Sequence, residues 1–186
     1  MSKTMHLRQR KRKVSKPSRK IPVVLAVLVV LAGSAVISGI FSAPTSRSLS
    51  SLAVDRIECN SMEQFVMHIH AHLDVFVNSQ RYTIPASIGI VPDTCFYWMH
   101  THDSSGIIHM EAPQIRSFTL GQFLDIWKKS FGNSSVPDGV PKVFVNGREI
   151  GGNYKDVMIG AHDEISVVYG SVPASIPSSY TFPEGL

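Results

Sequence analysis

The chain has 186 residues, which is enough for a basic tail, one membrane span and one domain. Its formal net charge of +4 originates in residues 1–20, which hold nine Lys or Arg and no acid, whereas the remainder holds 9 Lys or Arg and 14 Asp or Glu. The sequence contains no nucleophilic serine elbow, phosphate-binding loop or nucleotide fingerprint, which argues against those enzyme classes. A basic tail can bind nucleic acid, but this one adjoins a long apolar run, so a topology signal is favoured and no nucleic-acid partner is expected.

Residues 21–41 form an apolar run of 21 residues without a charge. At a rise of about 1.5 Å per residue, a helix of this length spans a bilayer core of ~30 Å. Because the positive flank stays in the cytoplasm, we expect a single-pass cell-membrane protein with a cytoplasmic N-terminus and an extracytoplasmic C-terminal part. A cleaved signal peptide is the alternative, but its apolar core usually has only about 7–15 residues, so an uncleaved signal-anchor is favoured.

Two cysteines, Cys59 and Cys95, follow the predicted span. The Ser-rich residues 42–57 that precede them predict a linker between the span and a domain. An even number of cysteines outside the membrane favours one disulfide, and thiolate ligation of a metal is the alternative.

Residues 67–78 alternate between apolar and polar side chains, a pattern typical of a strand with one apolar face. The polar face carries His68, His70 and His72, followed by Asp74. Residues two apart in a strand share a face, so the three imidazoles are expected to point the same way.

A second histidine group occurs in residues 95–113, where two expected strands flank the turn Asp-Ser-Ser-Gly. This turn predicts a register in which His102 lies opposite Ile107 and His100 lies opposite His109. One face of the pair then carries four potential ligands, His100, His102, His109 and Glu111. Cross-strand neighbours lie about 4.5–5.5 Å apart at Cβ, close enough for imidazoles to share a metal ion.

An amphipathic helix is predicted over residues 120–131. Thr119 and Gln122 fit a capping box, Phe118 and Phe123 fit a hydrophobic staple, and apolar residues then recur at helical spacing. The aromatic residues of this stripe are expected to pack in the core.

The C-terminal part predicts further strands and a tail. Asn146-Gly147 is a strong hairpin signal, residues 164–169 predict a final strand, and the Pro- and Ser-rich residues 171–186 predict an extended or disordered tail. The expected fold is α+β, a mainly antiparallel sheet with one helix packed on its apolar face, forming one extracytoplasmic domain over residues 58–170.

Six of the eight histidines are candidate metal ligands, and they are His68, His70, His72, His100, His102 and His109. A lone histidine, such as His162 in a turn, is usually an ordinary polar residue, but histidines at matching positions of three strands indicate a metal site. The triple in residues 68–72 either completes the same site or builds a second one. Met99 and Met110 fall on the opposite face, which argues against a thioether-rich Cu(I) carrier, so Zn²⁺ is ranked first and Cu²⁺ second.

The sequence leaves the chemistry of this site open, and Glu111 has three interpretations: metal ligand, catalytic base or orienter of an imidazole. The principal hypothesis is a membrane-anchored extracytoplasmic metal-binding protein. One alternative is a zinc-dependent hydrolase or hydratase in which three histidines hold Zn²⁺, the pKa of the bound water falls to roughly 7, and Glu111 shuttles protons. The other alternative is a protein that captures or delivers metal for a membrane-protein partner. A substrate-sized pocket beside an open coordination position would favour the enzyme, and a closed or fully exposed cluster would favour capture.

The segment CFYWMHTHDSSGIIHMEAP at residues 95–113, followed by FTLGQF at residues 118–123, resembles a family of prokaryotic membrane-anchored proteins. Those proteins are similar in having a basic N-terminus, one span and an upstream H-x-H-x-H strand, here His68 to His72. The similarity covers roughly residues 58–170 and implies that the ectodomain is one unit. It brings no assigned activity.

Overall fold

The computed structural model describes residues 52–186. The predicted cytoplasmic tail and span, residues 1–20 and 21–41, lie outside the described residues, as does most of the predicted linker, residues 42–57. Within residues 52–186, no helix is both long enough and apolar enough to cross a membrane. The membrane anchor therefore stays a prediction from the sequence.

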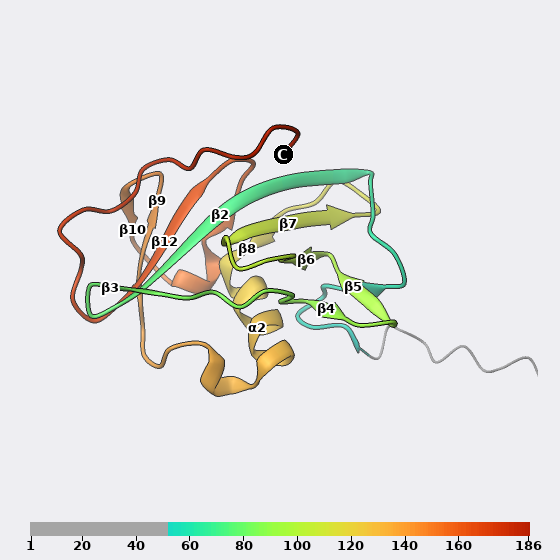
Figure 1. The fold of residues 1–186 in the computed structure, drawn as a ribbon, viewed down its shortest axis with the longest axis horizontal. Helices are drawn as coiled ribbons and strands as arrows, with labels where there is room; N and C mark the ends of the chain where they lie inside the picture. Colours follow the sequence, from blue (N-terminus) through green and yellow to red (C-terminus); the bar gives the residue numbers. More distant parts are fainter. Residues whose placement is uncertain (1–51) are drawn as a thin grey trace, which may run out of the picture. The chain divides into compact units, whose positions relative to one another are not determined.

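A seven-stranded sheet forms the centre of the described part of the chain (Figure 1). Six of its strands follow the order β10-β9-β12-β2-β7-β6, and β3 pairs with the C-terminal end of β2. Their bounds are β2 Met67–Val77, β3 Gln80–Tyr82, β6 Met99–His100, β7 Ile107–Ala112, β9 Lys142–Val145, β10 Arg148–Ile150 and β12 Glu164–Tyr169. Among these pairs, only β12 and β2 run parallel, so the prediction of an α+β fold with a mainly antiparallel sheet is confirmed.

The helix α2, Leu120–Phe131, packs on one face of this sheet, as Figure 1 shows. It begins at the predicted capping box, in which the Thr119 hydroxyl accepts the backbone N–H of Gln122 and the Gln122 side chain accepts the backbone N–H of Thr119. Its apolar stripe is buried against odd-numbered β2 residues such as Leu73 and against Met99 and Met110, which are fully buried. The predicted helix, its cap and the inward position of these two methionines are confirmed.

The remaining elements are short and flank the central sheet. They are a three-stranded sheet of β1 Cys59–Asn60, β5 Cys95–Tyr97 and β4 Ile90–Val91, a pair of β8 Phe118–Thr119 and β11 Met158–Ile159, and the 3₁₀ turns η2 Asn133–Ser135 and η3 Tyr154–Asp156. A Cys59–Cys95 disulfide joins β1 to β5, so the predicted disulfide is confirmed and neither sulfur is free to ligate a metal. Ile57, in the last part of the predicted linker, is fully buried.

The tail of residues 171–186 contains no helix or strand and packs across the sheet face opposite α2. Ile176 contacts a small apolar cluster that includes Phe76, and the ring of Tyr180 stacks on His72 with centroids 3.7 Å apart. Phe76 and His72 are even-numbered residues of β2 and share the histidine face of that strand. The tail therefore covers one end of this face.

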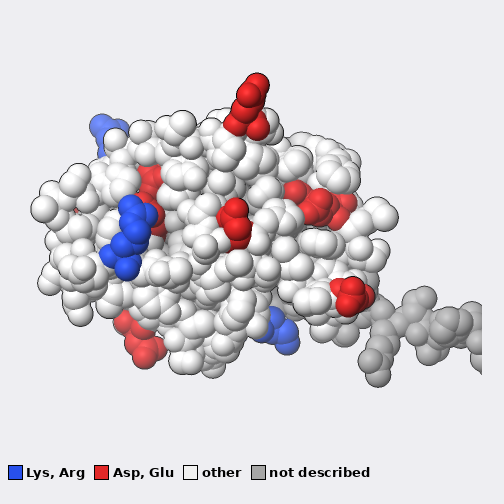
Figure 2. Space-filling model, in the orientation of Figure 1, with Lys and Arg blue, Asp and Glu red and all other residues white. Residues whose placement is uncertain are grey.

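Charged side chains on the described residues are dispersed. Residues 52–186 hold 8 Lys or Arg and 14 Asp or Glu, and on the face in Figure 2 the acidic side chains stand apart from one another. A net negative charge of this kind raises the local concentration of cations.

Candidate metal centre

Three adjacent strands bring the predicted ligands together. In the order β2-β7-β6, His70 of β2 lies opposite His109 of β7, and His109 lies opposite His100 of β6. This confirms the predicted pairing of His100 with His109. His68 lies opposite Glu111 in the same register. Because β7 is the middle strand, its polar side chains lie between those of β2 and β6.

His102 lies beyond the end of β6, so the predicted ladder pair with Ile107 is not formed. The next backbone N–H, that of Thr101, donates to the carbonyl of Ile88 at 3.0 Å. The His102 ring nevertheless lies against His109, with ring centroids 4.5 Å apart.

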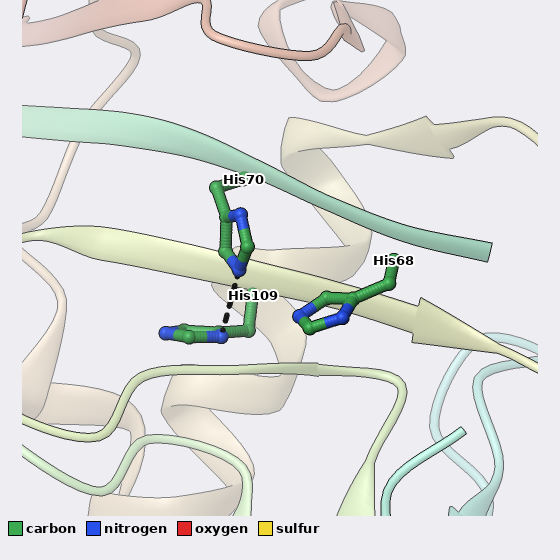
Figure 3. Close-up of side chains that lie close together, drawn as sticks. All are labelled: His68, His70 and His109. Carbon is green, nitrogen blue, oxygen red and sulfur yellow. Dashed lines mark hydrogen bonds between the residues drawn. The ribbon is translucent and has the colours of Figure 1, made fainter. Parts of the chain in front are cut away.

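The first set of potential ligands, which we call the β2–β7 group, consists of His68, His70, His109 and Glu111. Each of its three histidines offers a ring nitrogen within 4.8 Å of the other two. Figure 3 shows the three rings converging, with a hydrogen bond of 3.2 Å between His70 Nε2 and His109 Nδ1. Glu111 Oε1 lies 3.2 Å from His68 Nε2 and 3.6 Å from His109 Nδ1. Ligand atoms of a tetrahedral Zn²⁺ site with bonds of about 2.0–2.1 Å lie roughly 3.3–3.4 Å apart, so these separations fit such an ion.

The second set, which we call the β6 group, consists of Glu63, His100 and His102. Glu63 Oε1 lies 3.3 Å from His102 Nε2 and 3.7 Å from His100 Nε2. His100 is fully buried, and its Nδ1–H donates to the carbonyl of Tyr97 at 2.9 Å. Because that carbonyl can only accept, the hydrogen bond fixes the tautomer and leaves the lone pair on Nε2, as is usual for metal-ligating histidines.

His72 is not brought together with the other five histidines but belongs to a separate buried cluster. Its Nε2–H donates to the carbonyl of Ser105 at 2.9 Å, and its Nδ1 lies 2.6 Å from Glu164 Oε2. Asp74 joins the same cluster of potential ligands and is ion-paired with Arg81. Both ring nitrogens of His72 therefore already have partners, in contrast to His100.

Burial keeps two of the central histidines neutral. Burial lowers the pKa of His100 to about 4, and burial together with the neighbouring rings of His109 and His68 lowers the pKa of His70 to about 4. Burial alone raises the pKa of Glu111, but the hydrogen bond with His109 and the nearby histidines outweigh it and lower the pKa. Neutral imidazoles and an ionised carboxylate are the protonation states that bind a metal.

These shifts predict that the metal-free chain loses stability as the pH falls from 6.5 to about 4. In this range the unfolded chain, whose histidines keep a pKa near 6.5, binds more protons than the folded chain. The contribution of His100 is fully present above pH 6.5 and is lost on approach to pH 4, with a total of roughly 3 kcal/mol. Urea unfolding at several pH values measures the effect, and His100→Gln should reduce the pH dependence. An unchanged dependence in that variant would show that His100 is not the titrating group.

The space beside the histidines is small. A narrow hollow next to His100 and Glu111 is lined by residues 62–64 and 96–98 and leaves no space even for a water molecule. Small-molecule sites usually have volumes of about 300–1,000 Å³. Two larger hollows, around residues 90–96 and around Phe131, are lined by no histidine. By contrast, the side chains of His68 and His102 are 39% and 45% exposed, so the cluster opens to solvent at its edge.

Three further residues take part in these clusters, and the sequence pattern does not predict them. Glu63 lies in an irregular segment without periodicity, Glu164 reaches His72 from 92 residues away, and Tyr180 belongs to the tail. The only sequence signal for Glu63 is its position four residues after Cys59, because the disulfide holds this segment next to β5.

Comparison with known proteins gives no match for this chain, either among protein-family models or among curated proteins or solved structures.

Proposed function

We propose that this chain is a membrane-anchored extracytoplasmic protein that binds a transition-metal ion through the histidine face of its sheet. The observation that carries the proposal is the β2–β7 group: three imidazoles from two paired strands offer ring nitrogens within 4.8 Å of one another, and the Glu111 carboxylate lies beside two of them. Without a metal ion, burial of neutral histidines on this face would cost free energy, because burying polar groups without partners is unfavourable.

The donor set favours Zn²⁺, with Cu²⁺ as the second choice. Imidazole nitrogen and carboxylate oxygen suit both ions, whereas Mg²⁺ and Ca²⁺ prefer oxygen ligands alone. Met99 and Met110 are fully buried on the helix side of the sheet, so they are not available as thioether ligands for Cu(I).

Metal capture or delivery is the role that the surroundings of the site support best. The cluster reaches solvent through His68 and His102, which gives an ion a path to enter and leave. The predicted anchor at residues 21–41 would hold the domain at the outer face of the membrane, where a membrane protein could receive the ion.

A zinc-dependent hydrolase or hydratase is the second candidate. The hollow beside His100 and Glu111 has no space for a substrate molecule, which counts against this candidate. The lowered pKa of Glu111 suits a ligand better than a general base, whose pKa is usually near the working pH. In this alternative, Glu111 would move protons and His100, His102 and His109 would hold the metal.

Equilibrium dialysis of the purified full-length chain tests metal binding. We expect retention of Zn²⁺ and Cu²⁺ from micromolar solution at pH 7.5, and no retention of Mg²⁺ or Ca²⁺ under the same conditions. The two oxygen-preferring ions are the matched control, because they report non-specific binding to the acidic surface. Failure to retain either transition metal would overturn the proposal.

A further inference from the structure

The β6 group, Glu63, His100 and His102, lies on the far side of β7 from β2. The strand order β2-β7-β6 separates β2 from β6 by two strand spacings, about 10 Å. Ligands from β2 and from β6 therefore approach the middle strand from opposite sides. A single tetrahedral ion takes four ligands, fewer than the described residues gather at this place.

His100 is oriented for a partner that the described residues do not supply. Its Nε2 is buried and has no hydrogen-bond partner within residues 52–186, while its Nδ1–H is held by the carbonyl of Tyr97. Glu63 Oε1 lies 3.7 Å from this nitrogen, too far for a hydrogen bond but a separation that suits two ligands of one ion. The Nε2 of His102 lies 3.3 Å from the same oxygen, and ring nitrogens of His100, His102 and His109 also lie within 4.8 Å of one another.

Glu111 lies between the two sets. Its Oε1 is directed at His68 and His109 of the β2–β7 group. Its Oε2 is buried and lacks a hydrogen-bond partner in the described part of the chain, and a carboxylate oxygen of Glu111 forms a potential metal-binding group with Glu63 and His100. The Glu111 carboxylate thus lies close to potential ligands of both sets.

We propose that the domain binds two metal ions, one in the β2–β7 group and one in the β6 group, bridged by the carboxylate of Glu111. The second ion is held by His100 Nε2, His102 Nε2 and a carboxylate oxygen of Glu63, with Glu111 Oε2 as the fourth ligand. This inference rests on the proposed function for the first ion. Two-metal sites place their ions about 3.5–4 Å apart, a distance that one bridging carboxylate spans.

The number of ions bound by the purified full-length chain tests the proposal, with Zn²⁺ as the probe and dialysis followed by elemental analysis as the measurement. The expected result is two ions per chain. Glu63→Gln with His102→Ala should leave one ion, and His68→Ala with His70→Ala should also leave one. The matched control is His162→Asn, which alters an exposed histidine outside both groups at a position with positive φ that Asn tolerates.

The two proposals fail in different ways in this experiment. In one outcome the wild type binds one ion, which is lost in His68→Ala with His70→Ala but kept in Glu63→Gln with His102→Ala. This result would preserve the proposed function and overturn the second site. One ion lost in both double variants would show a single mixed site and would also overturn it. No ion in the wild type would overturn both. Circular dichroism of each variant establishes whether a lost ion reflects a lost fold.

A second measurement tests the bridge itself with Cu²⁺ as the probe. Two Cu²⁺ ions joined by one carboxylate couple magnetically, so the integrated electron paramagnetic resonance signal should fall below that of two isolated ions. A full two-ion signal at a stoichiometry of two would rule out the bridge. Glu111→Gln should restore the signal of any ions that remain bound.

Discussion

His109→Ala is expected to weaken metal binding at least about 100-fold and to leave the fold largely intact. His109 contributes Nδ1 to the β2–β7 group and is the residue of the middle strand that faces both His70 and His100. Loss of a partner that merely orients a ligand already costs about 10–100-fold in affinity, so loss of a ligand should cost more. Calorimetric titration of Zn²⁺ into the wild type and the variant measures the change.

Met110→Ala is the matched control for this variant because the two residues are neighbours on β7 and point to opposite faces. Met110 is fully buried in the core beneath α2. Its truncation should lower the free energy of unfolding by about 2–5 kcal/mol, and the folded chain should still bind metal. If His109→Ala bound Zn²⁺ like the wild type while Met110→Ala lost it, the assignment of the two faces would be wrong.

The local pattern of the sequence predicts the strands that carry the histidines. The alternation in β2 identifies its histidine face, and the turn after His102 predicts the pairing of His100 with His109. The capping box at Thr119 predicts where α2 begins. Each of these features depends on interactions between residues close in sequence, which is why periodicity and turn chemistry are sufficient.

The features of the site that the sequence could not predict depend on contacts between residues far apart in the chain. His72 has the same parity as His68 and His70, but the parallel pairing of β12 with β2 brings Glu164 next to it and gives it a different partner. Tyr180 reaches the same place through a tail with no regular structure. Neither contact has a periodic signal, so parity alone cannot show that His72 joins a separate cluster of potential ligands with Asp74 and Glu164.

The two histidine sets also differ in how the fold holds them. The β2–β7 group lies on paired strands of the central sheet, so backbone hydrogen bonds fix its spacing. In the β6 group only His100 lies on a strand, since His102 follows the end of β6 and Glu63 lies in the segment after β1. Binding of the second ion therefore depends on the contacts that hold residues 61–66 in place.

Removal of the Cys59–Cys95 disulfide tests that dependence and should have a large effect on stability. The bond closes a loop with a sequence separation of 36 residues. In the chain-entropy model, its loss should lower the free energy of unfolding by roughly 3–4 kcal/mol. Cys59→Ala with Cys95→Ala is the appropriate variant because both positions are buried and alanine adds no polar group.

The same variant should lose the second Zn²⁺ before the first. Glu63 lies four residues after Cys59. The other contacts of this segment include the short pairing of β1 with β5, the backbone N–H of Trp98 donating to the carbonyl of Glu58, and the indole N–H of Trp98 donating to the side-chain oxygen of Asn60. Denaturant unfolding gives the stability, and dialysis against graded Zn²⁺ gives the order of ion loss. Wild-type protein treated with a reductant should behave like the variant in both measurements. If the variant lost both ions together while still folded, the disulfide would support the whole histidine face rather than the segment that carries Glu63.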